Sequence, residues 1–198
     1  GAIAAGGTLG ILGPVGGGKT TLANLLVRLY DPPPGTVFLD GRDIRTLTLA
    51  SLRQAVVLAP TRELAEQIHE SFVSLGEKTG LHSTTVYGGV SINPQIQKLK
   101  KGSEIVVACP GRLLDHIQQK TIDLSRLEVL VLDEADQMFD MGFLPAIRKL
   151  LTHLPKERQT LLFSATMPLE IRSLASEVLK NPQTVQVDTV APAATVSH

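Results

Sequence analysis

The stretch "GPVGGGKT" (13–20) fits the pattern G-x-x-x-x-G-K-[ST] of a phosphate-binding loop. It is preceded by a short apolar run, "TLGILG" (8–13), which is typical of a buried strand. It is followed by "KTTLANLLVRLY" (19–30), in which apolar residues recur at helical spacing. The pattern requires this strand–loop–helix context, and the sequence therefore predicts a nucleotide-binding α/β domain.

The residues of this loop are suited to the phosphates of ATP or ADP together with Mg²⁺. Glycines let successive backbone N–H groups face one phosphate chain, and the start of the helix adds its positive end. Lys19 would reach the β- and γ-phosphates, and the hydroxyl of Thr20 would bind Mg²⁺. The alternative is a glycine-rich turn that only caps a helix. The predicted nucleotide-binding residues are Gly13, Pro14, Val15, Gly16, Gly17, Gly18, Lys19, Thr20 and Thr21.

The rest of the chain alternates between strands and helices. "PPPG" (32–35) predicts a turn, and "TVFLDGRDI" (36–44) predicts a β-hairpin. Further strands are predicted at 56–60, 83–89, 104–109, 127–133, 159–165 and 184–188, and helical stretches separate most of them. We expect an α/β fold, a three-layer P-loop NTPase with a mostly parallel sheet and a small β-hairpin insertion. Residues 1–189 would form one domain, and 190–198 would form a linker or tail.

A second motif, "VLVLDEAD" (129–136), places two carboxylates directly after an apolar strand. Ligands of parallel α/β sheets bind at the carboxyl ends of the strands. There Asp133 would hold Mg²⁺ through its hydration water, and Glu134 would orient or polarise the attacking water. The predicted catalytic residues are therefore Glu134, Asp133 and Lys19, and the metal ligands are Thr20 and Asp133. The alternative is an acidic helix start, which acidic residues also favour.

Composition excludes several other classes of protein. The chain has 198 residues and a formal net charge of zero, so nucleic acid could be held only by a local patch. Its single cysteine, Cys109, excludes an internal disulfide, and its five histidines form no zinc-ligand cluster with it. No apolar run is long enough for a membrane span, so we expect no membrane partner. The single cysteine agrees with a reducing compartment, and the expected location is the cytoplasm.

Two family resemblances divide the chain. Residues 6–53, "GGTLGILGPVGGGKTTLANLLVRLYDPPPGTVFLDGRDIRTLTLASLR", resemble the opening of an ABC-transporter nucleotide-binding domain. Residues 56–198 resemble the first RecA-like domain of a DEAD-box RNA helicase of the RhlE kind. That second resemblance rests on "PTRELAEQI" (60–68), "GG" (88–89), "PGRLLD" (110–115), "VLDEADQMFDMGF" (131–143) and "SATMP" (164–168).

The helicase resemblance implies roles for residues outside the nucleotide site. Arg62, Gly88, Gly89 and Arg112 match positions that contact the RNA backbone, and Ser164 and Thr166 match residues that couple the ATP state to domain closure. The structural alternatives are solvated arginines at helix starts, a strand exit at the glycines, and local hydrogen bonding of Ser164 and Thr166 to Asp136. Cys109 stands where the family usually has threonine before "PGR", so this chain lacks the hydroxyl that the resemblance implies for one RNA contact.

Together the resemblances suggest an engineered hybrid joined near Ala55–Val56, with an ABC-like segment 1–55 and a DEAD-box-like segment 56–189. Such a chain would bind Mg–ATP or Mg–ADP through a composite site and would be at most a slow ATPase. It would lack transport and helicase activity, and its RNA binding would be weak or absent. A monomer is expected, or a dimer through the hairpin edge. The alternatives are an RNA-dependent ATPase fragment of a DEAD-box helicase and a folded scaffold with an empty phosphate loop.

Overall fold

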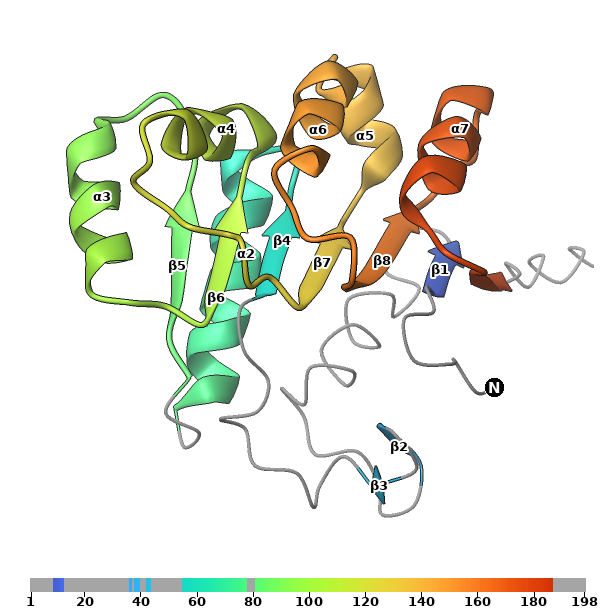
Figure 1. The fold of residues 1–198 in the computed structure, drawn as a ribbon, viewed down its shortest axis with the longest axis horizontal. Helices are drawn as coiled ribbons and strands as arrows, with labels where there is room; N and C mark the ends of the chain where they lie inside the picture. The colour runs from blue at the N-terminus through green and yellow to red at the C-terminus, as the bar shows by residue number, and fades with distance from the viewer. Residues whose placement is uncertain are drawn as a thin grey trace, which may run out of the picture.

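The computed structural model describes residues 9–12, 36, 38–39, 42–43, 55–77 and 81–186. Within them, seven strands form one sheet in the order β5-β6-β4-β7-β8-β1-β9, and every pairing in it is parallel (Figure 1). The strands are β1 (Leu9–Leu12), β4 (Ala55–Leu58), β5 (Ser83–Val86), β6 (Ile105–Ala108), β7 (Val129–Leu132), β8 (Gln159–Ser164) and β9 (Gln183–Gln186).

Helices connect the parallel strands, as the sequence predicts. They are α2 (Arg62–Gly76), α3 (Ile92–Lys100), α4 (Pro110–Gln118), α5 (Ala135–Asp140), α6 (Leu144–Leu151) and α7 (Leu169–Val178). The start of α2 is fixed locally, because the hydroxyl of Thr61 accepts a hydrogen bond of 3.2 Å from the backbone N–H of Leu64. The start of α4 is set by Pro110, whose missing N–H costs nothing in the first turn of a helix.

The sheet is covered on both faces, which gives the predicted three layers. Alternate residues of each central strand point to opposite faces, so Val56 and Leu58 pack with α4 to α7, while Val57 packs with α2. Figure 1 shows α2 behind the sheet and the other helices in front of it or above it. This arrangement follows from right-handed crossovers, since the chain moves one way along the sheet through α2 and the other way through the later helices. The expected α/β fold with a parallel sheet is confirmed.

The predicted hairpin is also present. Strands β2 (Phe38–Leu39) and β3 (Arg42–Asp43) pair antiparallel and form a two-stranded sheet separate from the seven-stranded one. The predicted phosphate loop, the helix expected at 19–30 and the tail at 190–198 lie outside the described residues. No helix of the described part of the chain is long and apolar enough to cross a membrane.

The strand expected at 83–89 is shorter than its sequence pattern. The run 83–89 predicts a strand throughout, but β5 ends at Val86. Tyr87, Gly88 and Gly89 form a loop instead, and Gly89 has φ +78°, a left-handed backbone conformation that favours glycine. Gly88 and Gly89 therefore mark the exit from the strand, which is the alternative to an RNA-facing turn that the sequence left open.

The burial of the core predicts how substitutions change the free energy of unfolding. Leu130 on β7 is 1% exposed, whereas Leu169 at the start of α7 is 80% exposed. Leu130→Ala should lower the free energy of unfolding by about 2–5 kcal/mol, because it leaves a cavity at the centre of the sheet. Leu169→Ala is the matched control and should change it by less than about 0.5 kcal/mol. Urea denaturation measures both, and equal losses would contradict this description of the core.

Candidate functional site

The carboxyl ends of four neighbouring strands are tied by one row of backbone hydrogen bonds. The N–H of Asp133 donates to the carbonyl of Leu58 at 3.0 Å, linking the end of β7 to β4. The N–H of Ala59 donates to Ala108 at 2.9 Å, and that of Cys109 donates to Val86 at 2.8 Å. The row brings together the DEAD motif, "PTREL", "PGR" and the loop that begins at Tyr87, although these motifs are far apart in the sequence.

The predicted phosphate loop begins at the same edge. Leu12, the last residue of β1, is paired with Ser164 of β8, and Leu162 of β8 is paired with Leu132 of β7. β1 and β7 are thus both neighbours of β8, and two strand spacings of about 5 Å each separate them. Residues 13–21 are not described, so their contacts stay a prediction. The register shows only that the chain leaves β1 at the edge where Asp133 lies.

The DEAD motif turns sharply at its second residue. Asp133 is 7% exposed, and its Oδ1 accepts a hydrogen bond of 3.0 Å from the backbone N–H of Glu134. Glu134 has φ 50° and ψ 53°, a left-handed conformation that costs about 1–2 kcal/mol in a residue other than glycine. Strain of this kind clusters at functional sites. The turn leaves Glu134 half-buried, and its carboxylate makes no hydrogen bond or ion pair with the described residues.

The acidic residues here suit Mg²⁺ better than a metal held by protein alone. Among the described residues, no group of three or more His, Cys, Asp or Glu side chains could hold a metal ion. Mg²⁺ does not need such a cage, because it binds through one or two carboxylates together with water and substrate phosphates. Asp133 supplies one such carboxylate, buried at the carboxyl end of β7.

The fourth residue of the DEAD motif is joined to the "SAT" motif. Asp136 Oδ2 accepts two hydrogen bonds of 2.9 Å, from the backbone N–H and the hydroxyl of Thr166. Ser164 donates to the carbonyl of Thr166 at 2.7 Å and accepts from the N–H of Asp136 at 3.2 Å. Burial acts to raise the pKa of Asp136, but these hydrogen bonds outweigh it and hold the pKa below its usual value. The expected hydrogen bonding of Ser164 and Thr166 to Asp136 is present.

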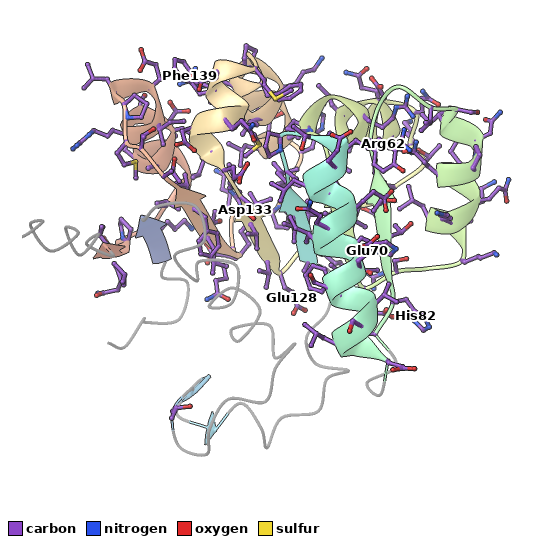
Figure 2. The ribbon with its side chains drawn as sticks, turned by 180° about the vertical axis from the view of Figure 1, so that it is seen from behind. Arg62, Glu70, His82, Glu128, Asp133 and Phe139 are labelled. Atoms are coloured by element: carbon purple, nitrogen blue, oxygen red, sulfur yellow. The ribbon has the colours of Figure 1, made fainter. Side chains whose placement is uncertain are left out.

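Arg62, an RNA candidate from the sequence, lies at the carboxyl edge (Figure 2). It is exposed, and its guanidinium carbon lies 5.0 Å from the centre of the Tyr87 ring. The Tyr87 hydroxyl donates to Oε1 of Glu66, which also accepts from Thr85 at 3.3 Å. The bond to Glu66 raises the pKa of Tyr87, as does burial, so Tyr87 stays protonated at neutral pH. Arg62 is therefore exposed to solvent, as the alternative expects, and also lies against the Tyr87 ring.

Arg112, the other candidate arginine, is part of the fold. Its side chain is only 14% exposed, its Nη2 donates to the carbonyl of Val90 at 2.9 Å, and its Nε lies 3.6 Å from a carboxylate oxygen of Asp115. The expected alternative of a solvated arginine is wrong for Arg112, because the loop after Gly89 covers it. Its role in the structure is to hold the end of that loop against α4.

A buried amide holds the start of the same loop. Nε2 of Gln95 donates to the carbonyls of Tyr87 at 3.0 Å and Ser91 at 3.4 Å. Its Oε1 lies 3.4 Å from Nε2 of His116, so that ring nitrogen is the donor. Burial lowers the pKa of His116, and its Nδ1 pairs with the hydroxyl of Thr121 at 2.7 Å.

Sequence reasoning missed Tyr87, Glu66 and Gln95. Tyr87 directly precedes the two glycines, and Glu66 lies within "PTRELAEQI", so both were adjacent to recognised motifs. The sequence does not mark Tyr87 and Glu66 as functional, because an aromatic residue at a strand end and a glutamate in a helix are ordinary there. Only the tertiary contacts show that they meet.

Cys109 occupies the N-cap position of α4 without capping it. No side-chain hydrogen bond is made from this residue to the helix. Burial, followed by the nearby carboxylate of Glu63, raises the pKa of the Cys109 thiol to about 11. The thiol is therefore protonated at neutral pH and unreactive.

A family model described as "DEAD/DEAH box helicase" matches residues 2–174. The chain belongs to this family. It is 48% identical over 134 residues to the DEAD-box ATP-dependent RNA helicase CshA of Bacillus licheniformis, covering 68% of this chain and 28% of that protein. It is 47% identical over 135 residues to the DEAD-box ATP-dependent RNA helicase 40 of Arabidopsis thaliana, covering 68% of this chain and 12% of that protein. The chain thus spans only a minor part of each relative.

Solved structures agree with this assignment. A hypothetical ATP-dependent RNA helicase from Sulfolobus tokodaii aligns with a TM-score of 0.76 and 31% identity, covering 92% of this chain and 48% of that one. A DEAD box protein from Methanococcus jannaschii aligns with a TM-score of 0.75 and 36% identity, covering 91% and 45%. The RecA-like fold expected from the sequence is confirmed.

The comparisons do not support the expected division at Ala55–Val56. The family match begins at residue 2 and continues across that boundary to residue 174. It therefore includes the predicted phosphate loop together with the DEAD motif, as a single helicase domain would.

The junction between the DEAD and "SAT" motifs yields a prediction. Asp136→Ala should lower the free energy of unfolding by about 1–2 kcal/mol at pH 7, a value reduced because this carboxylate is partly exposed. Since the folded pKa lies below the ordinary 3.8, the contribution is present above that pH and is lost as the pH falls through the folded value. The difference from the unmodified chain should therefore shrink below about pH 4.

Urea denaturation at pH 7 and at pH 3 tests this expectation. Asp140→Ala, which alters an exposed aspartate at the end of the same helix, is the matched control and should change stability by less than about 0.5 kcal/mol. A loss for Asp136→Ala that is equal at both pH values would rule out the ionised carboxylate as its source.

Proposed function

We propose that this chain is the ATP-binding domain of an ATP-dependent RNA helicase, and that RNA stimulates its hydrolysis of ATP. The observation that carries the proposal is the meeting of the DEAD motif with the "PTREL", "GG" and "PGR" segments along one row of hydrogen bonds at the sheet edge. ATP and RNA would bind to neighbouring stretches of this edge. The names of the relatives support the same activity.

At the nucleotide end, the chain's own residues would position ATP and the attacking water. The loop 13–21, with Lys19 and Thr20, would bind the phosphates, and Thr20 and Asp133 would hold Mg²⁺. When bound, Mg²⁺ would neutralise charge on the β- and γ-phosphates. Glu134, whose carboxylate is half-buried beside Asp133, would accept a proton from the water.

At the RNA end, Arg62 would contact a backbone phosphate. It is exposed, carries a permanent charge, and offers donors in a fork that matches phosphate geometry. The exposed glycines 88 and 89 would allow the RNA backbone to approach the loop closely. Arg112 would act mainly by holding that loop in place.

The hybrid origin expected from residues 6–53 is a finer prediction that the family match does not support. The RNA-dependent ATPase, which the sequence offers as an alternative to it, has the better support. The expectation of weak or absent RNA binding is likewise unsupported, because the chain belongs to the DEAD/DEAH box helicase family and its relatives are named RNA helicases.

Phosphate release with and without single-stranded RNA tests the proposal. RNA should raise the rate of the unmodified chain. Glu134→Gln should lower the RNA-stimulated rate by about 10²- to 10⁴-fold, since it removes the general base. The dissociation constant for ATP should change by no more than about twofold, because the phosphate contacts come from other residues.

Two further variants make the result specific. Lys19→Ala should weaken ATP binding at least about tenfold, because it removes a charge-assisted phosphate contact. Glu128→Gln alters an exposed glutamate at the opposite end of the β7 segment (Figure 2) and should leave turnover unchanged. Turnover that ignores RNA, or that survives Glu134→Gln, would overturn the proposal.

Cys109 gives a separate prediction of increased function. Cys109→Thr should raise the free energy of unfolding by about 0.5–1 kcal/mol, because its hydroxyl would cap α4 from an already extended N-cap. RNA affinity should rise by about fivefold, the effect of one added hydrogen bond of about 1 kcal/mol. Cys109→Ala removes the thiol without adding a hydroxyl and should produce neither gain. Urea denaturation and RNA fluorescence anisotropy measure the two effects.

A further inference from the structure

The geometry points to Tyr87 as a positioning residue for RNA binding, which acts through Arg62 by means of both its ring and its hydroxyl. This inference rests on the proposed function, in which Arg62 contacts RNA. Tyr87 itself is half-buried below the exposed surface of Arg62 and is not assigned a contact with RNA.

The ring fixes a side chain that would otherwise be mobile. A free arginine samples many rotamers, and ordering it on binding weakens affinity. The guanidinium carbon of Arg62 lies 5.0 Å from the centre of the Tyr87 ring, within the range of a cation–π interaction. This contact uses no lone-pair acceptor, and Arg62 makes no hydrogen bond or ion pair with the described residues. Its N–H donors are therefore held in place and remain available for a phosphate.

The hydroxyl keeps a competing carboxylate away from Arg62. Glu66 follows Arg62 by four residues on α2, the spacing at which opposite charges on a helix normally pair. No such pair forms, because Oε1 of Glu66 accepts hydrogen bonds from the Tyr87 hydroxyl and from Thr85. Both donors come from β5 and the residue after it. The hydrogen bond from Tyr87 thus holds the carboxylate of Glu66, which would otherwise pair with the guanidinium of Arg62.

Tyr87 is held in turn from the other side of the sheet edge. Its carbonyl accepts from Nε2 of Gln95 on α3, and Gln95 is 7% exposed and lies next to the fully buried His116. The backbone of Tyr87 is therefore anchored to α3 while its side chain is anchored to α2. This double attachment lets a half-buried aromatic residue set the position of an exposed charge.

The test measures binding of a fluorescently labelled single-stranded oligouridylate to the 198-residue chain by anisotropy, in the presence of Mg²⁺ and a non-hydrolysable ATP analogue. Arg62→Ala should weaken binding about tenfold, through the loss of one charge-assisted phosphate contact. Tyr87→Leu, which removes the ring and the hydroxyl, should weaken it about three- to tenfold. In the Arg62→Ala background, Tyr87→Leu should have no further effect, because Tyr87 acts only through Arg62.

A second comparison separates the hydroxyl from the ring. Tyr87→Phe keeps the ring but releases Glu66, and should weaken RNA binding by about twofold through a new Arg62–Glu66 pair. Glu66→Gln added to Tyr87→Phe should restore the affinity, since a neutral amide cannot neutralise Arg62. A merely structural role for Tyr87 would not give this rescue. Arg126→Ala, at an exposed arginine of the opposite sheet edge, is the control and should leave binding unchanged.

The outcomes distinguish a failure of the proposed RNA-binding function from a failure of the role given to Tyr87. Absence of RNA binding by the unmodified chain would overturn the proposed function and this inference together. RNA binding that Tyr87→Leu weakens equally with and without Arg62 would overturn the inference alone. Failure of Glu66→Gln to rescue Tyr87→Phe would overturn the role given to the hydroxyl. Circular dichroism confirms that each variant is folded before its affinity is compared.

Discussion

The parallel direction of all seven strands is the constraint on which the site depends. Because every described strand of the main sheet runs the same way, every strand end that carries a motif lies at one edge. The row of hydrogen bonds from Asp133 to Leu58, Ala59 to Ala108 and Cys109 to Val86 then fixes these ends relative to one another. A reversed strand would send its motif to the opposite edge, about 13 Å away for a strand of four residues. The fold therefore brings the motifs together before any side chain acts.

Strand β4 links the two proposed functions. On one side its last residue, Leu58, accepts a hydrogen bond from Asp133, which is proposed to belong to the nucleotide site. On the other side its continuation leads through Thr61, which caps α2, to Arg62, which is proposed to contact RNA. A shift of the DEAD motif would have to move β4 or break this bond. The hydrogen bonds of Asp136 with Thr166 extend the connection to the segment after β8, so the DEAD, "PTREL" and "SAT" motifs are joined along one edge of the sheet.

Much of this could be predicted from the sequence, and the limits are physical. Apolar strands alternating with helices predict the parallel sheet, since strands buried on both faces read as continuous apolar runs. The fold was predicted for this reason, and the strand end at Asp133 followed from it. The hairpin was predicted separately, from Asp40-Gly41 near the tip of "TVFLDGRDI". The contacts of Tyr87, Glu66 and Gln95 could not be predicted, because they join residues on three separate elements and none of them breaks a local rule. The same is true of Arg112, which looks like a solvated helix-start arginine in sequence but is 14% exposed in the structure.

The contrast between the two arginines explains how a chain with no net charge could bind RNA. A large positive field would attract RNA from a distance, but the formal charge here is zero. Affinity must then come from a few charges in fixed positions. Arg112 is used to hold the loop, through Val90, and Arg62 is held by Tyr87 while its acidic neighbour is occupied. Arg112 thus stabilises the loop, and Arg62 remains exposed on the surface with its donors available for a phosphate. Binding by a positioned charge depends less on net charge and more on the aromatic residue beneath it.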